Sequence, residues 1–134
     1  MQQAEDFRAE SEALFGLLDG ADTTRFDEPT LFKDWTINAV LQHLHFWNQM
    51  AGLQLTDEAE LSRRLGEEMR HEGGMRGFER AHFNEMGGRD LLESWHEDVA
   101  HTADLFADAD HKARLKRTGP EMRARSSIKA RMMD

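Results

Sequence analysis

The stretch Ile37-Asn38-Ala39-Val40-Leu41-Gln42-His43-Leu44-His45-Phe46-Trp47-Asn48-Gln49-Met50-Ala51-Gly52 has the sharpest helical pattern in the chain. Its apolar residues recur three and four positions apart, which places them on one face of an α-helix. They are Ile37, Val40, Leu44, Trp47 and Ala51. Thr36, directly before the stretch, is suited to cap the first turn. We therefore predict a core helix from Ile37 to about Gly52.

The segment on the N-terminal side predicts a second amphipathic helix, from about Gln3 to Asp19, with Gly20 as a stop signal. One stripe of this segment carries Ala4, Phe7, Ser11, Leu14 and Leu18. Residues Asp22 to Trp35 break the periodicity around Pro29, so we expect a loop that leads into the core helix.

The segments after Gly52 are weaker in pattern. Thr56-Asp57-Glu58 can start a third helix, whose narrow stripe of Leu61, Leu65 and Met69 predicts a position on the surface. The glycine-rich residues 73–88 predict an irregular connection with about two helical turns.

A strong helix is predicted from a cap at Asp90 to about Ala109. Its apolar stripe is Leu92, Trp95, Val99, Thr102 and Phe106. Thr118-Gly119-Pro120 stops a helix, so we expect residues His111 to Arg125 to form an extended crossing. Ser126 can cap a final helix that reaches Asp134 after about nine residues, a length below that of most bundle helices.

These elements predict an all-α protein: an antiparallel four-helix bundle with one long crossover and a short fourth helix, because no alternating apolar run long enough for a sheet occurs. With 134 residues, we expect a single domain over 1–134. The fourth helix is the weak point of this architecture.

Composition excludes several classes of protein. Hydrophobic residues make up 39% and charged residues 32%, which is too polar for a membrane span and too apolar for a disordered acidic tail. The first residues lack a secretory signal, so we expect a cytoplasmic protein. There is no Cys, so a metal would be held by His and carboxylates. Phosphate-loop, dinucleotide-binding and Gly-x-Ser-x-Gly motifs are absent.

The net charge of −9 is unevenly spread. From His111 onward the chain is basic, with a charge of +6, and residues 1–110 are acidic, with a charge of −15. We expect the basic end to pair with the acidic remainder of the same protein. An acidic body also argues against nucleic acid as a partner.

Two arrangements of histidine are candidates for metal binding. At about 100° per residue, His43 falls on the flank of the core stripe and points inward, while His45 lies about 200° away, so the pair cannot hold one ion. Considered on residues alone, a hydrogen-bonded core histidine is the commoner role for His43 and a metal ligand the alternative. Glu97 and His101 have i, i+4 spacing but lie off their core stripe, which favours a solvated face.

The segment Asp34-Trp35-Thr36-Ile37-Asn38-Ala39-Val40-Leu41-Gln42-His43-Leu44 resembles the second-helix motif of the DinB-like metal-binding four-helix bundles, and more closely the N-terminal domain of the mycothiol-dependent maleylpyruvate isomerase branch. Residues Gly119 to Ser126 and Ala130 to Asp134 resemble the entry into the fourth helix of an uncharacterised metal-binding group of that superfamily. With the Phe26–Thr30 loop and the Leu91–Trp95 helix start, the resemblance spans nearly the whole chain.

The resemblance implies that His43 is the second-helix metal ligand. It also implies that Asp134 is the carboxylate that opens a carboxylate-x-x-x-His pair on the fourth helix. The sequence stops before the matching histidine, so we expect this chain to be the N-terminal part of a longer protein.

The resemblance further implies a divalent metal (Zn²⁺, Ni²⁺ or Fe²⁺), a low-molecular-weight thiol as cofactor, and a thiol-dependent isomerase or transferase acting on a small molecule. Arg123 and Arg125 are candidates to bind an anionic substrate, and pairing with surface carboxylates is the commoner role for such arginines. Members of this superfamily often dimerise, so a homodimer is expected. The alternative function is a non-catalytic bundle that serves as a protein-interaction or dimerisation module.

Overall fold

A computed structural model describes residues 2–116, with side chains described to Ala113. This part of the chain is helical and holds no strand beyond an isolated bridge between Pro29 and Thr36, which confirms the all-α prediction. The elements are α1 (Gln2–Leu18), a 3-10 helix η1 (Thr23–Asp27), α2 (Ile37–Thr56), α3 (Glu58–Arg70), α4 (Gly74–His82) and α5 (Gly88–Lys116). The predicted fourth bundle helix, with Arg123, Arg125 and Asp134, lies outside the described residues.

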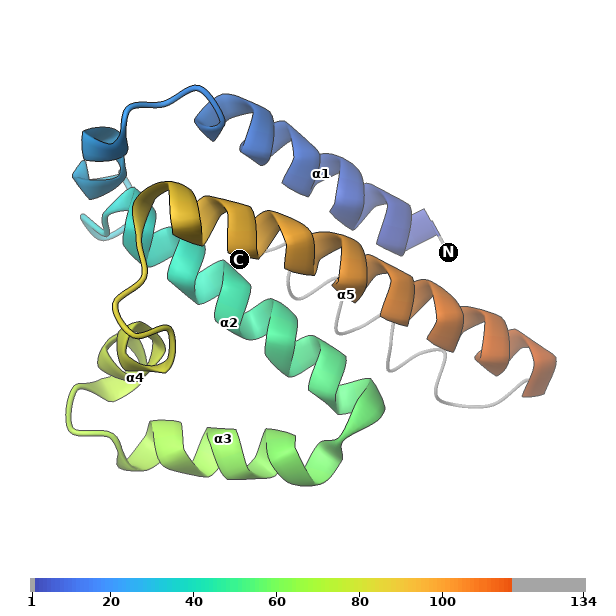
Figure 1. The fold of residues 1–134 in the computed structure, drawn as a ribbon. Helices are drawn as coiled ribbons and strands as arrows, with labels where there is room; N and C mark the ends of the chain where they lie inside the picture. The colour runs from blue at the N-terminus through green and yellow to red at the C-terminus, as the bar shows by residue number, and fades with distance from the viewer. Residues whose placement is uncertain (1, 117–134) are drawn as a thin grey trace.

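The main core lies where α5 packs against both α1 and α2 (Figure 1). The apolar stripes predicted for α1 and α5 face this core. Its buried members include Phe7, Phe26, Leu41, Trp95 and Phe106. Burial of such large side chains is the dominant favourable term in folding, so this core fixes how α2 lies against α5.

A smaller core covers a second side of α2. Phe46 and Met50 of α2 pack with Phe78 of α4 and with Phe83, which follows that helix. In Figure 1, α3 and α4 form an arm that leaves α2 and returns to α5. The weak α3 pattern is confirmed, because α3 has no fully buried residue. Since two sides of α2 are covered, its polar side chains face two different protein environments.

Three predicted boundaries are wrong. The core helix continues past Gly52 to Thr56, because this glycine does not stop α2 but lets α5 approach: a Cβ there would lie 3.3 Å from Leu105 Cδ1. The helix predicted from Asp90 is α5, and it begins at Gly88, so Asp90 lies in its first turn rather than at its cap. The same helix runs to Lys116, so residues 111–116 are not extended.

The longer α5 has a physical reason. Ala113 lies two turns after Phe106 on the same face of α5 and is 1% exposed. The buried face therefore continues past Ala109. Among the described helices, none is long and apolar enough to span a membrane.

Asn38 joins the start of α2 to the start of α5. Its Nδ2 donates to Asp27 Oδ1 at 2.9 Å, and its Oδ1 accepts the backbone N–H of Gly88 at 2.7 Å. The predicted cap is confirmed next to it, because Thr36 Oγ1 accepts the N–H of Ala39. These contacts fix the N-terminal half of α2, which carries His43.

Candidate functional site

His43 faces α4, not the main core. Its Nδ1 lies 2.9 Å from Glu79 Oε2, and its side chain is 18% exposed. Two indoles flank the imidazole, with centroid distances of 5.5 Å to Trp35 and 6.2 Å to Trp47. The predicted inward direction of His43 is correct in that the ring is mostly enclosed. The enclosure comes from α4 and the residues before α2.

Glu79 is the fully buried carboxyl group of this site. Its side chain is 0% exposed, although it lies on the short helix α4. The neighbouring Phe78 packs edge-on against Phe46, and this contact holds α4 against α2. Oε2 of Glu79 accepts from Trp47 Nε1 at 3.0 Å in addition to His43. Two aromatic N–H groups therefore converge on one buried oxygen.

The hydrogen bonds assign the protons at His43. An indole nitrogen can only donate, and a carboxylate can only accept, so Glu79 Oε2 acts as the acceptor of both bonds. The proton of neutral His43 is therefore on Nδ1, and the lone pair is on Nε2. Metal-ligating histidines are held in this way, with the second ring nitrogen donating to a carboxylate that orients the ring.

A second carboxyl group, that of Glu68, lies close enough to interact with the His43–Glu79 pair. The pKa of Glu68, on α3, is raised by burial and then by the negative charge of Glu79, while His43 acts in the opposite direction. Glu79 Oε1 and Glu68 Oε2 are both buried and have no hydrogen-bond partner within residues 2–113. Arg76 does not pair with them and lies over the Trp35 ring at 4.3 Å. The site is thus acidic and able to receive a cation or a proton.

The described residues supply part of a metal site. A catalytic zinc site has three protein ligands and one open position. No group of three or more His, Asp or Glu side chains that could hold a metal occurs within the described part of the chain. The chemistry of the His43–Glu79 pair fits one ligand with its orienting carboxylate. Asp134, the other ligand implied by the family resemblance, lies outside the described residues, as do Arg123 and Arg125.

His45 contacts different partners from those of His43. Its Nε2 lies 2.9 Å from Ser94 Oγ and its Nδ1 lies 3.5 Å from Asp98 Oδ2, both on α5. The two histidines therefore face different elements, as the helical wheel predicts. Glu97 and His101 are exposed, in agreement with the predicted solvated face.

Glu79 and Glu68 are the residues that sequence reasoning missed. Glu79 lies in the glycine-rich segment predicted to be mostly irregular, and neither helical spacing nor a motif connects it to His43. The single available signal is the apolar pair Phe78 and Phe83 around it, which indicates that this face of α4 is buried. A carboxylate on a buried face requires a partner, and that requirement could have identified Glu79.

Comparisons with known proteins give one match. The family model described as the mycothiol maleylpyruvate isomerase N-terminal domain matches residues 7–134. No curated protein and no solved structure matches the chain.

Proposed function

Because the chain belongs to the mycothiol maleylpyruvate isomerase N-terminal domain family, we propose that it is a divalent-metal-binding helical domain of a thiol-dependent isomerase or transferase. The observation that carries the proposal is the Nδ1 contact of His43 with the buried Glu79. That contact presents Nε2 as the basic nitrogen, which is what a metal-ligating imidazole requires.

Each residue of the site has a defined role in this proposal. His43 supplies one ligand through Nε2. Glu79 holds the ring in the correct tautomer and orientation, and Trp47 fixes the carboxylate by donating to the same oxygen. Trp35 and Trp47 limit the access of water to the imidazole. When bound, Zn²⁺, Ni²⁺ or Fe²⁺ would lower the pKa of a coordinated thiol or water and polarise a substrate carbonyl.

The rest of the proposed site comes from the C-terminal segment. We assign Asp134 as a second ligand on the strength of the family resemblance. We assign Arg123 and Arg125 to binding of an anionic small-molecule substrate because of their positive charge in the segment that leads to Asp134. The family match does not favour the alternative of a non-catalytic interaction module. Cytoplasmic location and homodimer formation stay predictions.

Metal content tests the proposal. The protein, purified without a histidine tag, is dialysed against Zn²⁺ or Ni²⁺ and analysed for bound metal. We expect about one ion per chain in the unaltered protein, and its loss in His43→Asn. The matched control is His101→Asn, which alters an exposed histidine and should leave binding unchanged. Equal metal in the two variants, with helicity intact by circular dichroism, would contradict the proposal.

A further inference from the structure

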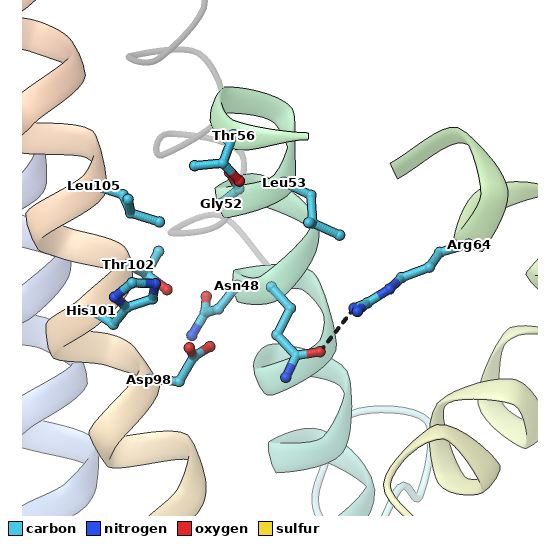
Figure 2. A pocket seen from close by; sticks show the side chains of 10 residues that line it. Asn48, Gly52, Leu53, Thr56, Arg64, Asp98, His101, Thr102 and Leu105 are labelled. Atoms are coloured by element: carbon cyan, nitrogen blue, oxygen red, sulfur yellow. Dashed lines mark hydrogen bonds between the residues drawn. The ribbon is translucent and has the colours of Figure 1, made fainter. Parts of the chain in front are cut away.

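A second polar site lies between α2, α3 and α5. It is a cavity of about 180 Å³, called the polar cavity below, and Figure 2 shows its lining. Polar residues that line it include Asn48, Gln49, Arg64, Asp98, His101 and Thr102. His43 and Glu79 do not line it, so this cavity is distinct from the proposed metal site.

The α5 wall of the polar cavity carries a negative charge. Asp98 Oδ2 faces His45 Nδ1 at 3.5 Å and accepts no hydrogen bond within residues 2–113. Neither Lys nor Arg pairs with this carboxyl group in that part of the chain. Oδ2 is buried beside His45, and the side chain as a whole, which lines the cavity, is 20% exposed. A carboxylate of this kind favours a cationic donor, because a charge-assisted hydrogen bond is stronger than a neutral one.

The α3 wall carries a positive charge that is already oriented. Arg64 Nε donates to Glu60 Oε2 at 2.8 Å, and Arg64 Nη1 donates to Gln49 Oε1 at 3.1 Å. A guanidinium has five N–H groups, so these two bonds leave three donors. In Figure 2, Arg64 reaches from α3 toward α2, while Asp98 extends from α5 on the opposite side of the α2 residues.

Gln49 adds a second fixed donor. Its Oε1 accepts from Arg64 and lies 3.0 Å from His82 Nε2, so the amide oxygen is turned toward α3 and α4. The amide nitrogen is therefore on the other side of the group, where it can donate to a ligand. The cavity thus combines an acceptor from α5 with donors from α2 and α3.

We propose that the polar cavity binds a small zwitterion of amino-acid size, with its ammonium group at Asp98 and its carboxylate at Arg64 and Gln49. The volume of about 180 Å³ agrees with this class, since a protein cavity of about 150 Å³ admits an organic molecule the size of benzene. A zwitterion supplies a group for each wall: a cation for Asp98, which has no Lys or Arg partner within residues 2–113, and an anion for the Arg64 donors that its bonds to Glu60 and Gln49 leave over. The site requires no metal and does not depend on the proposed function.

The first test uses the unaltered protein, so it does not depend on the folding of a variant. Serine is titrated into ¹⁵N-labelled protein, followed by propylamine and propionate, which each carry one of the two charged groups. We expect serine to shift the backbone amides of Asn48, Asp98 and Thr102, and each single-charge compound to bind at least about tenfold more weakly, or 1.4 kcal/mol. No shift with serine, or equal affinity for the three compounds, would overturn the proposal.

Two pairs of neighbouring residues give matched variants. Asp98→Asn and Arg64→Gln each remove one charge of the cavity, and each should weaken serine binding at least about tenfold. Glu97→Gln removes the adjacent exposed carboxylate, and Arg63→Gln removes a neighbouring arginine that also pairs with Glu60. Both control variants should bind serine as the unaltered protein does. Equal loss in a variant and its control would contradict the assignment, and added chelator should leave serine binding unchanged.

Discussion

Glu79 joins α4 to α2 at the candidate metal site. It is a carboxyl group with a fully buried side chain that accepts two N–H groups on one oxygen. A buried ion of this kind is tolerated only with partners, and removal of one partner strands the others. The sequence could predict His43, because a motif and a helical face both indicate it. It could not predict Glu79, because the contact joins residues of α2 and α4 that no local pattern connects.

Replacement of Glu79 tests this role. Glu79→Ala leaves the N–H groups of His43 and Trp47 without an acceptor, at a cost of about 1–3 kcal/mol for each buried group. We expect the free energy of unfolding in urea to fall by about 2–4 kcal/mol. Glu79→Gln keeps an acceptor oxygen and should cost less. The control is Glu85→Ala, an exposed position whose ion pair with Arg80 spans 3.7 Å. A loss below about 1 kcal/mol in Glu79→Ala would contradict the assignment.

The lowered pKa of His82 predicts that the free energy of unfolding falls in mild acid. Burial, and then the charge of Arg64, lower the pKa of His82 in the folded protein below its ordinary value near 6.5. The unfolded chain therefore binds the proton more readily, so this stability is present above about pH 6.5 and is lost as the pH falls through the folded pKa. The raised pKa of Glu68 acts with the opposite sign at lower pH.

The comparison of His82→Gln with His101→Gln isolates this effect. Urea midpoints are measured at pH 7.5 and at pH 5.0. We expect the unaltered protein and His101→Gln to lose stability over this interval, and His82→Gln to lose measurably less. Identical slopes in the two variants would show that His82 does not contribute.

The helices differ in how well their local sequence predicts their position and their ends. Regular spacing of apolar residues predicts α1, α2 and α5, because each buries a stripe in the main core. Boundaries are less well determined, since the apolar spacing of α2 ends near Gly52 although the helix continues to Thr56, and Gly52 packs closely against Leu105. The position of α4 rests on Phe78 and Phe83 meeting Phe46, a contact that depends on tertiary structure.

The start of α5 gives a prediction at this scale. Gly88 has a φ of +60°, and a Cβ there would lie 3.2 Å from Thr23 Cγ2. Gly88→Ala should therefore lower the free energy of unfolding by about 1–2 kcal/mol, because the left-handed conformation is strained for alanine. Gly20→Ala is the control, since a Cβ at that position meets nothing within 4 Å. Equal stability of the two variants, measured by thermal unfolding, would contradict the described start of the helix.

At the scale of the whole molecule, the two cores hold different sets of helices together. The main core joins α1, α2 and α5, and the smaller core attaches α3 and α4, which carry Glu68 and Glu79 to the α2 surface. The smaller core therefore holds α3 and α4 against α2 through apolar side chains, and His43, Glu68 and Glu79 are not among them. This arrangement explains why a site of converging acidic groups is compatible with a stable fold.

Metal binding should therefore stabilise the folded protein. A ligand that binds only the folded state raises its stability by about 2.7 kcal/mol at a hundredfold excess over the dissociation constant. We expect Zn²⁺ to raise the unfolding temperature of the unaltered protein and chelator to reverse the change. His43→Asn should show neither response. An equal response in His43→Asn would place the metal elsewhere.

We propose that His43 binds metal through Nε2 because Glu79 holds the proton on Nδ1. Two-dimensional NMR of protein labelled with ¹⁵N in its histidine rings measures both statements in one spectrum. We expect neutral His43 to carry its proton on Nδ1. We expect Zn²⁺ to shift the Nε2 resonance of His43 and to leave that of His101 in place. A proton on Nε2, or a zinc titration that leaves the His43 ring nitrogens unchanged, would contradict the proposal.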